Sequence, residues 1–155
     1  KIYDQSGLNP DDTFPGTDKT VAEVLLTPTR LYVEAVRNIM RDWEIHGMVH
    51  ITGGGFYDNI VRVLPKTVTA RLRFGAWSIP PVFDWIRAQG DLSWEEMLQI
   101  FNCGVGYIMV VMKDVAKDVV HRRGALKQDA WIIGEIAERV DDEEQVRIVF
   151  PSPGE

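Results

Sequence analysis

The sequence predicts a single domain of the α/β or α+β class, in which helices pack on a layered, mixed β-sheet. About five strand-like segments are interspersed with roughly four or five helical segments, which is the pattern of a layered domain. Hydrophobic residues make up 45% and charged residues 26% of the 155 residues, as in ordinary globular proteins. A chain of this length can bury a core of its own. We expect residues 1–24 to form a linker and N-terminal extension, residues 25–150 the folded domain, and residues 151–155 a frayed tail.

Helix signals recur along the chain as apolar residues at helical spacing, capping residues, and glycine or proline stops. They predict a short helical turn over residues 21–26 and helices over residues 27–44, 56–64, 81–90, 93–101 and 114–123. Thr27 and Pro28 form the clearest start, because threonine caps a helix and proline suits its first position. Pro81 and Ser93 open two further helices, and Gly124 closes the last. Residues 1–20 are polar and turn-rich, so we expect a loop there.

Strand signals are the short apolar or alternating segments between these helices. They cover residues 48–52, 67–74, 105–112, 130–138 and 145–150. The continuous apolar run over 105–112 predicts a strand covered on both faces. The last two segments predict a closing hairpin over the acidic turn Asp141–Glu144. We expect that turn to be a solvated loop, because four consecutive carboxylates make a poor metal cage.

Charge and cysteine content exclude several classes of protein. A formal net charge of −6 argues against a nucleic acid or an anionic membrane as partner. One cysteine excludes an internal disulfide framework and fits a reducing compartment, so we expect a cytoplasmic protein. The longest apolar run is too short to span a bilayer. The chain begins at Lys1 without an initiator methionine, which suggests a part of something longer.

Three consecutive glycines, Gly53, Gly54 and Gly55, separate the strand over 48–52 from the helix that follows. A glycine turn that opens a helix points backbone N–H groups at one spot beside the positive end of the helix dipole, which suits a phosphate. His50 and Thr52 are two apart on a strand and project to the same face, so they can add a titrating group and a hydroxyl to this pocket. A tight turn with nothing bound explains the glycines equally well.

Several sharper motifs are absent from the sequence. No Lys-Ser or Lys-Thr follows the glycines, so there is no Walker A loop, and the dinucleotide fingerprint fails at Asp58 and again at Met109. The three histidines are not accompanied by a pair of cysteines, so we predict no metal site. A nucleophilic pair of Cys103 with His50 is conceivable, although a lone cysteine is more often a small buried hydrophobe.

A second informative stretch runs from Phe101 to Gly106, with the sequence Phe-Asn-Cys-Gly-Val-Gly. Asn102 tolerates the left-handed conformation, and its amide can bond the backbone or a ligand. The two glycines allow another backbone or a ligand to approach closely. The alternative is a helix C-cap followed by the start of a strand.

Together these motifs closely resemble the C-terminal half of the aminoimidazole ribonucleotide synthetase family, the phosphoribosylformylglycinamidine cyclo-ligases. The matching segments are His-Ile-Thr-Gly-Gly-Gly-Phe at 50–56, Asn59, Arg-Val-Leu-Pro at 62–65, and the stretch at 101–106. The resemblance covers roughly residues 25–149 in the same order and spacing. Departures are modest: Asp58 stands where the family usually has Glu, and Tyr107 replaces the usual Met. The family's N-terminal domain, which carries the main ATP-binding elements, has no counterpart in this sequence.

The resemblance implies an ATP-dependent cyclo-ligase of purine biosynthesis that converts formylglycinamidine ribonucleotide to aminoimidazole ribonucleotide. The formyl amide oxygen would be phosphorylated, the amidine nitrogen would attack, and phosphate would leave. This chain would form one wall of the substrate and nucleotide cleft. ATP and Mg²⁺ would bind mainly to the N-terminal domain, in a full-length homodimer, and this chain alone would be inactive.

The resemblance also implies roles for individual residues. His50 would be catalytic, and the residues that bind substrate or phosphate would be Thr52, Gly53, Gly54, Gly55, Asn59, Arg62 and Asn102. Asn59 and Arg62 are one helical turn apart, so we expect them on one side of the helix. Two alternatives stay open. One is the C-terminal domain of a related ATP-using enzyme, such as formylglycinamidine ribonucleotide synthetase or selenophosphate synthetase, and the other is a non-catalytic module that binds a phosphate ligand.

Overall fold

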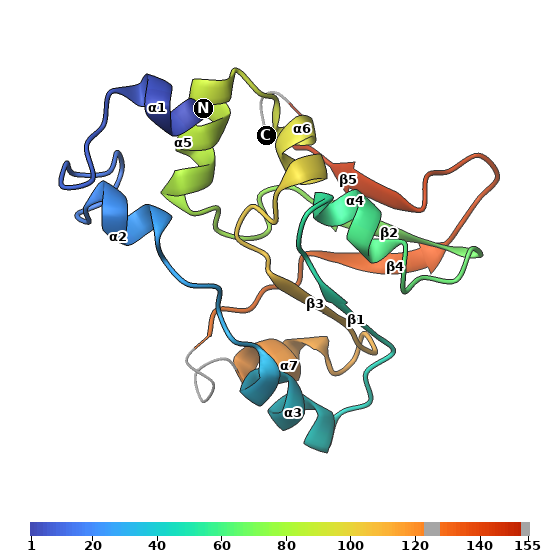
Figure 1. The fold of residues 1–155 in the computed structure, drawn as a ribbon. Coiled ribbons are helices and arrows are strands. Elements are labelled where there is room, and N and C mark those ends of the chain that lie inside the picture. Colours follow the sequence, from blue (N-terminus) through green and yellow to red (C-terminus); the bar gives the residue numbers. More distant parts are fainter. Residues whose placement is uncertain (123–127, 153–155) are drawn as a thin grey trace.

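The computed structural model describes residues 1–122 and 128–152 and confirms an α+β fold (Figure 1). The helices are α1 (Ile2–Ser6), α2 (Val21–Leu25), α3 (Val33–Asp42), α4 (Gly55–Ile60), α5 (Pro81–Gly90), α6 (Trp94–Ile100) and α7 (Ala116–His121). The strands are β1 (Gly47–His50), β2 (Val68–Arg73), β3 (Tyr107–Val110), β4 (Gly134–Glu138) and β5 (Val146–Val149). None of the helices within these described ranges is long and apolar enough to cross a membrane.

The strands form two sheets. β1 and β3 pair antiparallel, with His50 opposite Tyr107 at one end of the pair. The second sheet has the order β4-β2-β5, in which β2 is antiparallel to β4 and parallel to β5. This second sheet is therefore mixed, as the sequence predicts.

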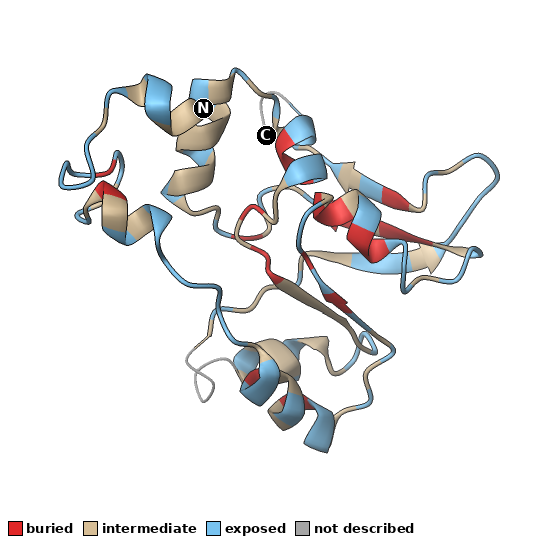
Figure 2. Cartoon of the chain, viewed as in Figure 1, coloured by how far each residue is buried: buried red, intermediate tan, exposed pale blue. Residues whose placement is uncertain are grey.

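The core lies between these sheets and the helices α4 and α6. Phe56, Met97 and Leu98 are fully buried there, and the ring of Phe56 stacks on Trp77 at a centroid distance of 5.5 Å. Figure 2 shows the buried residues concentrated on α4, on β2 and on the inner side of α6. The turn that precedes α4 is thus attached to the best-packed part of the molecule.

Several predicted helices are confirmed within one or two residues. Proline at the first position opens α5. A capping box opens α6, because the Ser93 hydroxyl accepts from the Glu96 N–H while the Glu96 carboxylate accepts from the Ser93 N–H. The last predicted helix is present as α7, and its predicted end at residues 123 and 124 lies outside the described residues.

The predicted helix start at Thr27 and Pro28 is wrong, since α3 begins at Val33. The Thr27 hydroxyl donates to the Glu23 carbonyl at 2.6 Å, so it closes α2 and does not cap the next helix. Farther along, α3 lies beside α7 (Figure 1), where Arg122 donates to the Asp42 carboxylate at 2.6 Å.

The N-terminal segment is more ordered than the predicted loop over residues 1–20. It contains the short helix α1, which packs on α5. Phe14 is fully buried and meets Trp85 of α5 edge to face, with ring centroids 5.3 Å apart. One aromatic anchor therefore attaches the segment to the domain.

The predicted closing hairpin is wrong, because β4 and β5 lie on opposite sides of β2 and do not pair with each other. The connection between them is held to β2 at two points. The carboxylate of Glu143 accepts from the guanidinium of Arg71 at 2.9 and 3.0 Å, and the hydroxyl of Thr69 donates to the Glu144 carbonyl at 2.8 Å. Asp141, Asp142 and Glu144 are exposed, as expected of a solvated loop, whereas Glu143 is half-buried against Arg71.

The prediction of a strand covered on both faces over 105–112 is also wrong. All four residues of β3 are half-buried. β3 pairs with β1 alone, in a two-stranded sheet. Continuous apolar character therefore does not bring full burial here.

Candidate functional site

The glycine turn joins β1 to α4, and its second and third glycines are required by their conformation. Gly54 is the N-cap of α4 with φ 89°, and Gly55 has φ 56°, values that side chains rarely adopt. A Cβ at Gly54 would lie 2.7 Å from the Asp58 side chain, and one at Gly55 would lie 2.8 Å from the backbone of Gln99 on α6. A Cβ at Gly53 would have no atom within 4 Å. Close contacts therefore leave no room for side chains at Gly54 and Gly55, whereas the space around Gly53 is open.

Asn59 lies directly beneath this turn and is 3% exposed. Its side-chain NH₂ donates to the carbonyls of Gly55 at 2.7 Å, Gly53 at 3.2 Å and Thr52 at 3.5 Å. The donors of the buried amide are thus occupied by three carbonyls of the turn. No acceptor in residues 1–122 or 128–152 takes the backbone N–H of Gly53 or Gly54.

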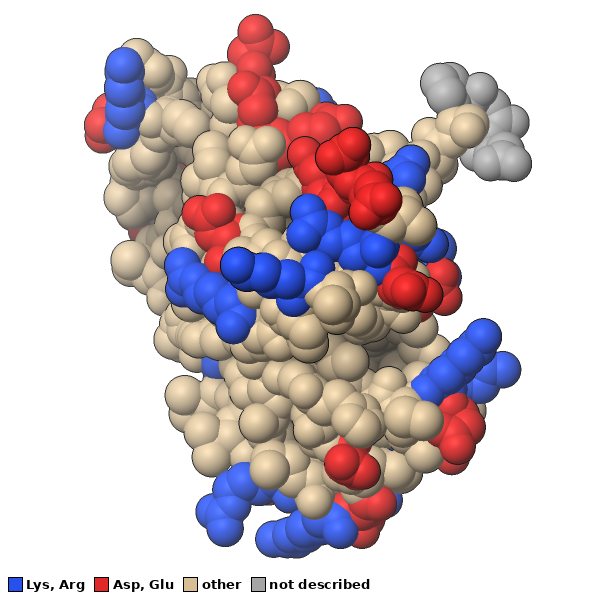
Figure 3. Space-filling view, turned by 90° about the vertical axis from the view of Figure 1, so that its right-hand side faces the viewer, with Lys and Arg blue, Asp and Glu red and all other residues tan. Residues whose placement is uncertain are grey.

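Arg62 is exposed whereas Asn59 is buried, so the structure does not bring the two side chains together as expected. Helix α4 ends at Ile60, and Arg62 lies in the following turn, with an exposed side chain. Among the described residues its guanidinium forms no ion pair. Figure 3 shows a band of Lys and Arg on one face, flanked by Asp and Glu, so no single charge dominates that face.

His50 and Thr52 are exposed, whereas Val49 and Ile51 are buried. The imidazole of His50 borders a hollow of about 380 Å³. Its other walls come from the residues before α3, from α3 itself and from β3: Arg30, Leu31, Tyr32, Val36, Arg37 and Tyr107. The glycine turn does not line this hollow. The structure therefore places His50 and the turn on neighbouring surfaces and not in one closed pocket.

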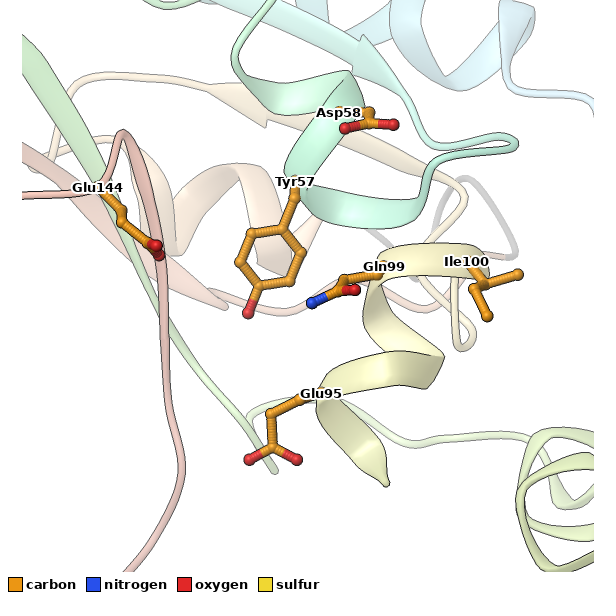
Figure 4. Close-up of a pocket in the computed structure, with 6 residues that line it drawn as sticks. All are labelled: Tyr57, Asp58, Glu95, Gln99, Ile100 and Glu144. Atoms are coloured by element: carbon orange, nitrogen blue, oxygen red, sulfur yellow. The ribbon is translucent and has the colours of Figure 1, made fainter. Parts of the chain in front are cut away.

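A second hollow, of about 520 Å³, is lined by residues of α4, of α6 and of the connection between β4 and β5 (Figure 4). The phenol of Tyr57 points into it beside Gln99, with the carboxylates of Glu95 and Glu144 nearby. Burial raises the pKa of Tyr57, and Glu144 and Glu95 raise it further. Asp58 adds a third carboxylate to the lining. This acidic hollow is unsuited to a phosphate, and no sequence pattern indicated it.

The second motif is a tight turn that supports the core. The Asn102 side-chain oxygen accepts from the Gly104 N–H at 3.1 Å, and the Trp77 indole donates to the Cys103 carbonyl at 3.0 Å. Cys103 is fully buried, and burial raises the pKa of its thiol to about 12. A nucleophilic pair of Cys103 with His50 is therefore excluded, and the cysteine is a small buried hydrophobe.

Comparisons with known proteins give one consistent result. A family model described as "AIR synthase related protein, C-terminal domain" matches residues 2–147. The phosphoribosylformylglycinamidine cyclo-ligases of Nitratidesulfovibrio vulgaris and Oleidesulfovibrio alaskensis are 60% and 59% identical to the chain over 151 residues, which is 97% of this chain and 43% of each relative. That of Lawsonia intracellularis is 46% identical over 150 residues. The chain thus spans less than half the length of these relatives.

Proposed function

The chain belongs to the family of AIR synthase related proteins, as their C-terminal domain, and from this premise we propose that it is part of an ATP-dependent phosphoribosylformylglycinamidine cyclo-ligase. The observation that carries the proposal is the 59–60% identity to two proteins of that name across nearly the whole chain. The reaction is the ring closure of formylglycinamidine ribonucleotide to aminoimidazole ribonucleotide in purine biosynthesis. The same names favour it over the related synthetases and over a non-catalytic module.

In this proposal the glycine turn binds a phosphate of the substrate or the nucleotide. The support is the backbone N–H groups of Gly53 and Gly54, which have no acceptor among the described residues, the open space at Gly53, and the turn carbonyls held by Asn59. Asn59 acts by shaping the turn, since its own donors are occupied. Thr52 adds a hydroxyl at the edge, and Arg62 a guanidinium suited to forked phosphate contacts.

His50 is the proposed catalytic residue, because a histidine can move a proton or stabilise developing charge near neutral pH. The exposed imidazole at the end of β1 is accessible to a substrate held at the turn. Asn102 contributes from the neighbouring motif by holding the turn that leads into β3. These residues would form one wall of a cleft.

We assign ATP and Mg²⁺ mainly to the part of the relatives that this chain does not span. Within the described ranges, no three His, Cys, Asp or Glu side chains gather closely enough to hold a metal ion. Large apolar side chains at Leu26, Leu31 and Val33 are 79%, 82% and 67% exposed, which suits contact with an N-terminal domain. A homodimer in the cytoplasm completes the proposal.

The test is a chimera in which this chain replaces the matching segment of the Oleidesulfovibrio alaskensis relative. We expect ATP-dependent formation of aminoimidazole ribonucleotide by the chimera and none by the chain alone. An unfolded chimera is recognised by its melting curve. A folded chimera that makes no product contradicts the proposed function.

Two matched pairs of variants then test the residues. His50→Ala should lower turnover, whereas His46→Ala, which removes an exposed histidine four residues away, should not. Gly54→Val should weaken substrate binding by about 1–3 kcal/mol through backbone strain and bulk at the turn. Gly7→Val meets the same strain at φ 72°, with no atom within 4 Å, and should leave KM unchanged. If Gly54→Val lowers only the melting temperature, the turn is purely structural.

A further inference from the structure

Three aromatic rings from separate segments of the chain meet at His50. Tyr32 is the N-cap residue of α3, His50 ends β1, and Tyr107 begins β3. The His50 ring lies 5.9 Å from Tyr32, edge to face, and 6.1 Å from Tyr107 in a tilted arrangement. The two tyrosine rings are 5.4 Å apart. These separations are within the range of favourable ring contacts.

Strand pairing fixes one side of this cluster. His50 is directly opposite Tyr107 in the antiparallel β1–β3 pair, so the two side chains lie on the same face of the sheet. The Ile51 N–H donates to the Gly106 carbonyl at 2.9 Å and extends the pairing past His50. Strand pairing therefore fixes the backbone of His50 and Tyr107, both at these residues and at the next position, Ile51 with Gly106.

Gly106 makes room for the third ring. A Cβ at Gly106 would lie 2.8 Å from Cζ of Tyr32 and would also collide with its hydroxyl. The backbone of Gly106 is not in the left-handed region, so its own conformation does not require glycine. The three atoms nearest to such a Cβ all belong to Tyr32, so the missing side chain makes room for the ring that packs against His50.

We propose that Tyr32 and Tyr107 are positioning residues that hold the imidazole of His50 in one orientation at the mouth of the 380 Å³ hollow, and that Gly106 provides the space for Tyr32. An exposed histidine at a strand end otherwise exchanges between rotamers. The catalytic consequence rests on the proposed function of His50, but the orientation of the ring does not.

The orientation is tested by NMR of the imidazole C–H groups in the chain itself. His46 and His121 serve as internal references, and His50→Ala identifies the His50 signals. We expect ring-current shifts and contacts between the His50 and tyrosine protons. Tyr32→Ala should abolish these contacts and move the His50 signals toward those of a free histidine. Tyr32→Phe should retain them, because it keeps the aromatic ring that packs edge to face on His50.

A double-mutant cycle separates this role from general destabilisation. Gly106→Ala should displace Tyr32 and change the His50 signals as Tyr32→Ala does. The double variant should resemble Tyr32→Ala alone, because removing the ring removes the collision. Tyr3→Ala, which truncates a half-buried tyrosine of α1, should leave the His50 signals unchanged. Unchanged His50 signals in folded Tyr32→Ala, or additive effects of the two changes, would overturn the proposal.

Activity in the chimera gives the second readout. Tyr32→Ala should lower kcat at least about tenfold, as expected when a catalytic group loses its position, with a smaller change in KM. Tyr32→Phe should restore kcat. In a His50→Ala background, Tyr32→Ala should have no further effect on kcat. If His50→Ala alone leaves kcat unchanged, the catalytic assignment of His50 fails, and the NMR result still decides the orientation.

Discussion

Replacement of Asn59 gives the sharpest test of how the glycine turn is built. Asn59→Ala removes two strong hydrogen bonds, to Gly55 and Gly53, and one long one to Thr52. Each strong bond contributes about 1 kcal/mol, and the small cavity adds to the loss. We expect the free energy of unfolding to fall by about 2–4 kcal/mol. For a domain of this size the melting temperature should drop by roughly 5–15 °C.

The measurement is thermal and urea unfolding of the chain, followed by circular dichroism. Asn9→Ala is the matched control, because Asn9 is exposed and its amide contacts only an exposed Asp12. That variant should change stability by less than about 0.5 kcal/mol. If Asn59→Ala melts within about 2 °C of the parent but weakens ligand binding, Asn59 is a ligand contact and its assignment as a support is wrong.

Asn59→Asp refines the test at constant volume. The substitution replaces the donating NH₂ with an oxygen that faces three carbonyl oxygens. Burial among acceptors disfavours the ionised form, so the folded pKa of this carboxyl should rise above its unfolded value of about 3.9. The folded state then binds more protons than the unfolded state, and stability falls as pH rises through this interval. A destabilisation that does not grow between pH 4 and neutral pH would contradict this reasoning.

Three further predictions follow from other contacts. Gly55→Ala should be strongly destabilising, because its Cβ meets the backbone of α6, while Gly53→Ala should leave the melting temperature nearly unchanged; unfolding curves of both check this, and equal effects would contradict it. The Cys103 thiol, with its pKa raised to about 12 by burial, should resist alkylation at pH 8 until the chain unfolds, and rapid labelling of the native protein would contradict its burial. Arg71 lowers the pKa of Glu143, so this pair should contribute stability that is present above the ordinary carboxyl pKa and is lost as pH falls through the lowered folded value. Glu143→Gln should reduce that acid dependence, and an unchanged pH profile of unfolding would argue against it.

The sequence predicted those elements whose signals are local and unambiguous. Proline before α5 and the Ser93–Glu96 box before α6 satisfy the backbone of their own helices, so no distant contact is needed to choose them. The helix start predicted at Thr27 is wrong because a threonine hydroxyl can close one helix as well as open the next, and here it donates to the Glu23 carbonyl at the end of α2. The hairpin prediction failed because strand partners were chosen by contacts about 70 residues apart, such as Arg71 with Glu143.

The candidate site shows the same division. Three glycines between a strand and a helix indicated the turn, and the structure has it. The inward direction of Asn59 depends on how α4 sits against the turn, and residue spacing alone does not reveal it. Family resemblance was confirmed, yet it named Tyr107 only as a departure, whereas the structure places that ring beside His50.

The central place of β2 has a consequence for the order in which the chain is made. Both neighbours of β2 come from the C-terminal end, and about 60 residues separate Arg73 from the start of β4 at Gly134. At synthesis rates of 5–20 residues per second, roughly 3–12 s pass after β2 is made before β4 begins to be synthesised. During this time both edges of β2 lack a partner strand. Open strand edges are templates for pairing between chains. A chain that stops before residue 134 would keep both edges exposed, so truncation at this end should cause aggregation and not merely the loss of a tail.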